Sequence, residues 1–214
     1  MAERTSRREA MAGRKRCGGA FSDRRYQDRS RRLPDMMNRN VLHIDRDAIG
    51  AVSKREFADA MSRMAATVSV VTACDAGEAH GRTVTAVLSL SAEPPMVLVS
   101  VKSDSALATA ILSDGGFSLA MLAEGQEMIG DAFAGKVPPH AQRFLIGVWS
   151  EWPSGRPRLF GASAAIDCEL AGSVPMADHT LFAGLVTNTD LPLHSRPLLW
   201  ARRNYRALRH DADL

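Results

Sequence analysis

Residues 81–105 read GRTVTAVLSLSAEPPMVLVSVKSDS, and this stretch decides the fold. Its β-branched and apolar runs, residues 84–90 and 96–101, predict two neighbouring strands. The dipeptide Pro94-Pro95 between them cannot continue a strand and indicates a turn. The stretch therefore predicts two strands that pair with each other and lead into the segment that follows.

The first of these strands alternates hydroxyl and apolar side chains. Side chains of a strand point to opposite faces in turn, so hydroxyls spaced by two or four residues share one face. These hydroxyls belong to Thr83, Thr85, Ser89 and Ser91. The apolar residues Val84, Ala86, Leu88 and Leu90 then form the other face, which suits a core. The hydroxyl row is either an ordinary solvated face or the lining of a polar site.

The second strand ends in a group of polar residues ahead of a predicted helix at residues 105–112. Unpaired N–H groups and a positive dipole end at a helix N-terminus favour anions. Lys102, Ser103 and Ser105 beside that terminus therefore suggest a seat for a phosphate. Asp104 opposes this interpretation, because its carboxylate repels phosphate unless it points away.

Charge is distributed unevenly along the 214 residues. Residues 1–40 contain 12 Lys and Arg against 5 Asp and Glu, and they carry few apolar side chains. We therefore expect a basic, disordered tail over residues 1–45 and one domain over residues 46–214. Acidic residues interrupt the tail, so we expect no nucleic-acid partner.

Three cysteines, Cys17, Cys74 and Cys168, form no C-x-x-C pair and are odd in number. This pattern argues against a disulfide framework and a zinc site, and it favours a reducing, cytoplasmic setting. No apolar run approaches the roughly 18 residues of a membrane span, so we expect no membrane partner.

The remaining segments predict a mainly β fold with flanking helices. Ser53 and Glu56 fit a capping box, and the helix that follows has Phe57, Met61 and Met64 at core-facing spacing. Further strands are predicted at residues 67–72, 117–122, 162–170 and 178–189, with residues 197–200 and 204–209 completing the sheet. Six or more strands with few helices suggest a closed or nearly closed barrel.

Common catalytic motifs are missing from the sequence. It contains neither G-x-G-x-x-G nor G-x-x-x-x-G-K-[ST], and its histidines have no metal-ligand spacing, so we assign no metal site. A hydroxyl-rich site without a strong nucleophile or base is compatible with chemistry carried by a bound organic cofactor.

Three segments together resemble the flavin reductase family, the small NAD(P)H-dependent reductases of two-component flavin monooxygenases such as the 4-hydroxyphenylacetate 3-monooxygenase. They are TVTAVLSLS at residues 83–91 with EPP at 93–95, DHTLFAG at 178–184, and RPLLW at 196–200 with YR at 205–206. The resemblance implies a split β-barrel that binds FMN or FAD, usually as a homodimer, and uses NADH or NADPH as hydride donor. Ala177 stands where the Gly-Asp-His-Thr signature of the family has glycine, which puts the local turn in doubt.

Residue roles also follow from the resemblance. It implies that Thr85, Ala86, Ser89 and Ser91 line the isoalloxazine ring and ribityl chain, that Lys102, Ser103 and Ser105 hold the phosphate, and that His179 lies near the nicotinamide. Tyr205, with Phe133 and Trp200, either shapes the flavin pocket or packs in the core.

The leading functional hypothesis is a flavin reductase that transfers hydride from the nicotinamide to flavin N5 and supplies a partner monooxygenase. One alternative is a flavoprotein that reduces a cobalt corrin in cobalamin biosynthesis. Another, from a different class, is a non-catalytic flavin- or haem-binding split barrel.

Overall fold

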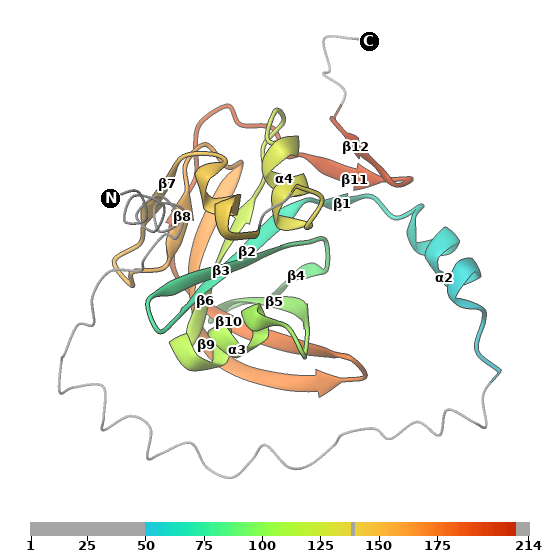
Figure 1. Cartoon of the computed structure of the whole chain (residues 1–214), viewed down its shortest axis with the longest axis horizontal. Coiled ribbons are helices and arrows are strands. Elements are labelled where there is room, and N and C mark those ends of the chain that lie inside the picture. The colour runs from blue at the N-terminus through green and yellow to red at the C-terminus, as the bar shows by residue number, and fades with distance from the viewer. Residues whose placement is uncertain (1–49, 138–139, 209–214) are drawn as a thin grey trace, which may run out of the picture.

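The computed structural model describes residues 50–137 and 140–208 (Figure 1). The tail expected at residues 1–45 lies outside the described residues. The expectation that this tail has no nucleic-acid partner concerns the same residues. No helix of the described part is long and apolar enough to cross a membrane. No group of three or more His, Cys, Asp or Glu within it could hold a metal ion.

Antiparallel strands dominate the structure, as the sequence predicts. The strands of the main sheet are β2 (Ser69–Asp75), β3 (Glu78–Val84), β4 (Val87–Ala92), β5 (Pro95–Lys102), β6 (Gly116–Met121), β9 (Ala164–Met176) and β10 (His179–Asp190). Smaller sheets contain β1 (Ala66–Thr67) with β11 (Leu199–Ala201) and β12 (Asn204–Arg206), and β7 (Trp149–Glu151) with β8 (Pro157–Leu159). The helices are α2 (Lys54–Met61), α3 (Ala106–Asp114), α4 (Glu127–Phe133) and the 3-10 helix η2 (His140–Leu145).

The main sheet has the order β3-β2-β6-β9-β10-β5-β4 and curls into a split barrel. Val71 on β2 and Val99 on β5 belong to one buried cluster, although three strands separate them in the sheet. A flat sheet would hold them about 19 Å apart at the usual spacing between strands, so the sheet must curve. Helix α3 adds Leu107 and Ile111 to the same cluster and thereby covers the interior of the barrel.

A second apolar cluster lies on the other face of β2. Val70 belongs to this second cluster, whereas its neighbour Val71 belongs to the first, because successive side chains of a strand point to opposite faces. Helix α4 contributes Ile129 and Phe133 to the second cluster. Strand β2 is therefore buried on both faces from Ser69 to Ala73, and Val70, Val71 and Thr72 are its β-branched residues.

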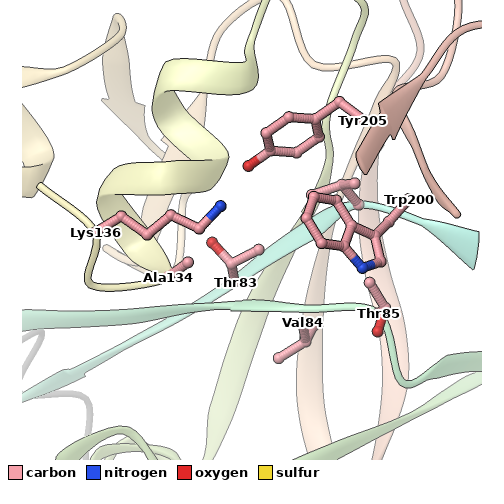
Figure 2. A pocket seen from close by; sticks show the side chains of 8 residues that line it. Thr83, Val84, Thr85, Ala134, Lys136, Trp200 and Tyr205 are labelled. Atoms are coloured by element: carbon pink, nitrogen blue, oxygen red, sulfur yellow. The ribbon is translucent and has the colours of Figure 1, made fainter. Parts of the chain in front are cut away.

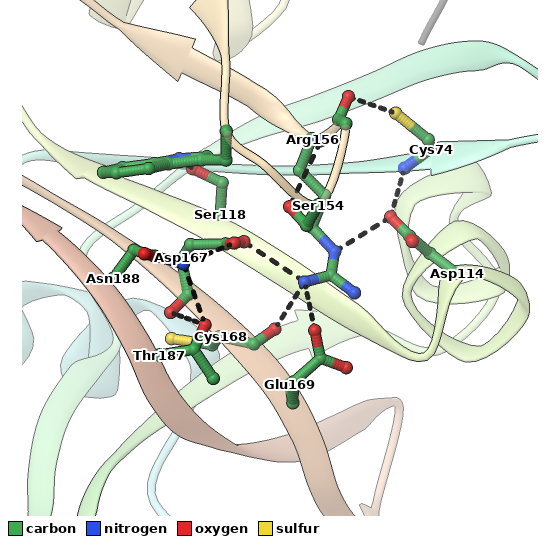
Figure 3. A network of polar contacts seen from close by, with 12 residues as sticks. Cys74, Asp114, Ser118, Ser154, Arg156, Asp167, Cys168, Glu169, Thr187 and Asn188 are labelled. Carbon is green, nitrogen blue, oxygen red and sulfur yellow. Dashed lines mark hydrogen bonds and ion pairs between the residues drawn. The ribbon is translucent and has the colours of Figure 1, made fainter. Parts of the chain in front are cut away.

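A buried ion cluster holds the segment between β7 and β8 against the barrel (Figure 3). Arg156 is 3% exposed, and its guanidinium lies 3.2 Å from Asp114 Oδ2, 3.1 Å from Asp167 Oδ1 and 3.0 Å from Glu169 Oε1. Burial opposes the positive charge, but Asp114, Glu169 and Asp167 outweigh it and raise the pKa of Arg156. Arg156 thus joins this segment to the end of α3 and to β9.

Helix α2 corrects one expectation about the core. Its capping box is present, with Ser53 Oγ accepting from Glu56 N and the Glu56 carboxylate accepting from Ser53 N. However, none of its residues is buried, and Phe57, Met61 and Met64 are exposed. The helix lies away from the barrel, at the right of Figure 1, so its apolar stripe packs against no apolar cluster of residues 50–137 and 140–208.

Strand β4 and the C-terminal strands β11 and β12 also differ from the sequence prediction. Leu88 and Leu90 are exposed and not in the core, because β4 is an edge strand and a bulge lies between Ser89 and Ser91. Strand β11 pairs with β1 on one side and β12 on the other in a separate sheet, so these strands do not complete the barrel sheet.

Candidate functional site

The turn between β5 and α3 brings the three predicted phosphate-binding residues together. Ser105 is the N-cap of α3; its Oγ accepts from Ala108 N at 3.2 Å and donates to Lys102 O at 2.6 Å. Lys102 Nζ lies 3.0 Å from Asp104 Oδ2, so this carboxylate pairs with the lysine beside it. The turn presents a cation and two hydroxyls at a helix N-terminus, and the Asp104 carboxylate offsets part of the charge.

His179 lies beside this turn. It stands opposite Lys102 in the β10–β5 register, and its Nδ1 is 2.9 Å from Asp178 Oδ1. The hydrogen bond from His179 lowers the pKa of Asp178, so this carboxyl group is ionised at neutral pH. Ser103 N also donates to Asp178 O, at 3.0 Å. The β9–β10 turn and the β5–α3 turn therefore form one continuous surface.

Ala177 adopts the left-handed conformation in the β9–β10 turn. Its φ is +56°, a region that favours glycine because a Cβ is disfavoured there. The turn is thus formed despite the missing glycine of the family signature.

The predicted row of hydroxyls is divided between two strands. Strand β3 ends at Val84 and β4 begins at Val87, so Thr83 and Thr85 do not share a regular strand with Ser89 and Ser91. Thr83 Oγ1 donates to Gly130 O at 2.6 Å and holds α4. Ser91 Oγ accepts from Glu93 N at 3.2 Å within the turn after β4. Of the four hydroxyls, those of Thr83 and Thr85 reach the pocket described next.

A pocket of about 150 Å³ lies between the end of β3, the end of α4 and the β11–β12 hairpin (Figure 2). Its lining residues are Val68, Thr83, Val84, Thr85, Ala134, Lys136, Trp200 and Tyr205. The Trp200 and Tyr205 rings meet edge to face with centroids 5.0 Å apart. Both therefore face the pocket, whereas Phe133 is fully buried in the second apolar cluster.

Lys136 in this pocket, and Asp131 next to it, were not predicted from the sequence. Lys136 Nζ lies 2.7 Å from Asp131 Oδ1, and the Tyr205 hydroxyl donates to the same oxygen at 2.7 Å. The hydrogen bond from Lys136 lowers the pKa of Asp131, and burial together with Asp131 raises the pKa of Tyr205. A Lys five residues after an Asp at a helix end is too common a pattern to single out, and Tyr205 is distant in sequence.

The pocket and the β5–α3 turn are connected through β5. Ala86 O, next to Thr85 in the pocket wall, accepts from Ser100 N at 3.1 Å. Lys102 follows two residues later, which is about 7 Å along a strand. A ligand with a planar ring in the pocket and a phosphate at the turn would need a short flexible chain between them.

The sequence profile of the flavin reductase like domain matches residues 61–209, more than half of the chain. The chain belongs to the flavin reductase family. In this flavin reductase, the described split barrel carries the pocket and the β5–α3 turn within the matched region.

Named relatives of this flavin reductase include reductase components of monooxygenases. It is 39% identical over 153 residues to the reductase component of FADH(2)-dependent resorcinol hydroxylase of Rhizobium sp. strain MTP-10005, covering 71% of this chain and 85% of that protein. It is 35% identical to the 4-hydroxyphenylacetate 3-monooxygenase reductase component of Thermus thermophilus, covering 72% and 97%. It is 36% identical to the FMN reductase (NADH) RutF of Ancylobacter novellus, covering 64% and 75%.

Solved structures confirm the split-barrel fold of this flavin reductase. The flavin reductase PheA2 in its native state superposes with a TM-score of 0.68 at 30% identity, covering 74% of this chain and all of that one. The NADH:FAD oxidoreductase SgcE6 of Streptomyces globisporus C-1027, in complex with NAD and FAD fragments, gives 0.69 at 25% identity, covering 77% and 100%.

Proposed function

We propose that this protein is an NAD(P)H-dependent flavin reductase that supplies reduced FMN or FAD to a partner monooxygenase. The observation that carries the proposal is the connection of an aromatic-walled pocket at Thr85 to a cationic, hydroxyl-bearing helix N-terminus at Lys102–Ser105, through β5. In a member of the flavin reductase family, this arrangement fits the ring, chain and phosphate of a flavin.

The donor set matches the chemistry of that ligand. Lys102, Ser103 and Ser105 would hold the phosphate, where a helix dipole and a lysine favour negative charge. Thr85 and Tyr205 line the pocket and would contact the ring. Ala86, Ser89 and Ser91 lie outside its lining, and the family resemblance assigns them to the ribityl chain. His179 would position the nicotinamide. The flavin, when bound, supplies the chemistry, since its N5 accepts hydride from the nicotinamide C4.

The protein then contributes binding and orientation, because direct hydride transfer between two bound rings requires no general base. Exclusion of water by Trp200 and Tyr205 would limit side reactions in the pocket. The reductase components among the relatives support a monooxygenase as acceptor over a cobalt corrin. Their names likewise support catalysis over a non-catalytic flavin- or haem-binding barrel.

An anaerobic stopped-flow experiment tests the proposal. Purified protein with bound FMN or FAD is mixed with NADH or NADPH, and the yellow absorbance band of the flavin is followed. We expect the band to disappear at a rate that saturates with the nicotinamide. Tight binding of flavin without loss of the band would support the non-catalytic alternative, and absence of flavin binding would contradict both.

We also propose that the protein forms a homodimer. Phe57 on α2 is 57% exposed, and Leu88 and Leu90 on β4 are 49% and 47% exposed. The polar side of α2 contacts its own chain, since Arg203 pairs with Asp59 and Arg202 N donates to Ser62 O. Among the described residues, the apolar stripe of the helix and the apolar face of the edge strand are both exposed. A two-fold arrangement of two copies would bury both surfaces twice.

A further inference from the structure

Lys136 supplies the positive charge among the eight residues that line the pocket. It follows α4 through Gly135, which adopts a φ of +83°, and Lys136 N donates to Asp131 O at 3.0 Å. The turn that ends α4 therefore sets where the lysine leaves the backbone. Figure 2 shows the ammonium group pointing toward Thr83 and Tyr205, into the pocket.

The ammonium group is held by one carboxylate and two rings. Asp131 Oδ1 accepts from both Lys136 Nζ and the Tyr205 hydroxyl, each at 2.7 Å. Lys136 Nζ also lies 5.3 Å from the centroid of the Trp200 ring and 5.6 Å from that of Tyr205, distances typical of cation–π contacts. An ammonium group has three N–H donors, so two remain after the bond to Asp131.

The neighbours of the ammonium group suit the edge of a planar heteroaromatic ring. The pocket lining includes the hydroxyl residues Thr83 and Thr85 together with apolar surface from Val68, Val84 and Trp200. Mostly apolar pockets with a few convergent polar groups bind such rings and fix their orientation. Thr85 lies in this wall, and Ala86 leads from it to the turn with Lys102.

Reduction changes the charge of a flavin ring but not that of its phosphate. Transfer of a hydride moves two electrons and one proton from the nicotinamide C4 to flavin N5. The nicotinamide becomes a cation, and the flavin ring gains one negative charge until a second proton arrives from solvent. A cation beside the ring therefore stabilises the reduced form more than the oxidised form. A cation beside the phosphate stabilises both forms equally.

We propose that Lys136 contacts the flavin ring and stabilises its reduced, negatively charged form, and that Asp131 and Tyr205 position the lysine for this contact. The inference rests on the proposed flavin reductase function. It assigns different tasks to the two lysines of the site: Lys136 distinguishes the oxidation states of the ring, whereas Lys102 binds the phosphate irrespective of oxidation state.

The test compares Lys136→Met with Lys136→Arg and with Lys102→Met as the matched control. For each protein, the dissociation constants of oxidised and dithionite-reduced FMN are measured anaerobically, and the midpoint potential of the bound flavin is measured with reference dyes. We expect Lys136→Met to lower the preference for reduced over oxidised flavin about tenfold, which lowers the potential of this two-electron couple by about 30 mV. Lys136→Arg should retain most of the preference. Lys102→Met should weaken both oxidation states alike and leave the potential unchanged.

Two further outcomes separate this inference from the proposed function. The effect of Lys136→Met should shrink at acidic pH, where the reduced ring is protonated and neutral, and a purely structural role of the lysine would give no such dependence. If the wild-type protein binds flavin and Lys136→Met shifts both affinities equally or neither, the inference is wrong while the proposed function stands. If the wild-type protein binds neither form, the proposed function itself fails.

Discussion

The guanidinium of Arg156 occupies the space beside the backbone of Gly116 in which a side chain at position 116 would have to lie. A Cβ there would meet Arg156 Nη2 and the carbonyl oxygen of Cys168 at distances that real Cβ atoms do not show. The glycine therefore permits the ion cluster of Arg156 with Asp114, Asp167 and Glu169 to form against β6.

Gly116→Ala should consequently be strongly destabilising. The new methyl group must displace Arg156 from its carboxylates or move β9, and breaking a buried ion pair costs about 3–5 kcal/mol. Urea unfolding of the variant measures the change in the free energy of unfolding. Gly50→Ala is the matched control, because nothing lies within 4 Å of the added Cβ there. A loss below about 1 kcal/mol for Gly116→Ala would show that the cluster relaxes easily.

Ser105→Ala should weaken binding of FMN more than binding of riboflavin, which lacks the phosphate. The hydroxyl of Ser105 accepts from Ala108 N, and on binding its one O–H would turn from Lys102 O to the phosphate. Loss of that charge-assisted hydrogen bond costs on the order of 1–2 kcal/mol. Fluorescence titration with both ligands gives the two affinities. Equal weakening of both would mean that Ser105 acts only through the cap, whose loss should also lower the free energy of unfolding by about 1 kcal/mol.

His179→Ala should slow reduction of bound flavin by NADH while leaving flavin affinity unchanged. His179 begins β10 opposite Lys102, at the rim of the assigned site, and is not among the residues that line the pocket. Stopped-flow reduction rates and flavin titration measure the two effects separately. His194→Ala serves as control, since His194 is exposed and lies in the segment that follows β10. Reduction at the wild-type rate would remove His179 from the mechanism.

Local hydrogen bonding explains which parts of the structure could be predicted from the sequence. The Ser53 capping box and the Ser105 cap join residues three apart, so their sequence contains all the partners. The turn that gathers Lys102, Ser103 and Ser105 was predicted for the same reason. The site beyond that turn depends on the family resemblance, because no local pattern connects Thr85 with Tyr205.

Long-range packing explains the features of the structure that could not be predicted from the sequence. Asp131 binds both Lys136 and the hydroxyl of Tyr205, and Tyr205 lies 74 residues after Asp131 in the sequence. No local sequence pattern therefore predicts this group. The stripe of Phe57, Met61 and Met64 was recognised correctly as apolar, but its spacing does not identify what covers it. Likewise, the bulge in β4 disrupts an alternation that looked regular in the sequence, and Leu88 on this edge strand is exposed.

Phe57→Asp should convert a dimer into a monomer without unfolding the protein. None of the α2 residues is buried in the single chain, so the substitution removes little within it, whereas a charge in an apolar interface is costly. Light scattering after size-exclusion chromatography gives the mass, and circular dichroism reports the fold. Ala58→Asp adds the same charge to the neighbouring exposed position and should leave the mass unchanged. A wild-type monomer would contradict the homodimer proposal directly.

Cys168 should make the stability of the protein fall at alkaline pH. Its thiol is free and fully buried; burial, with the negative charge of Asp167, raises its pKa to about 12 from 9.0. Because the folded-state pKa is above the unfolded value, the stabilisation is present below pH 9 and is lost as the pH rises toward 12. Between pH 9 and 10, before tyrosines titrate, the free energy of unfolding should fall by about 1 kcal/mol per pH unit. Urea unfolding at each pH, compared with Cys168→Ala, isolates this contribution. Equal slopes for the two proteins in that window would contradict it.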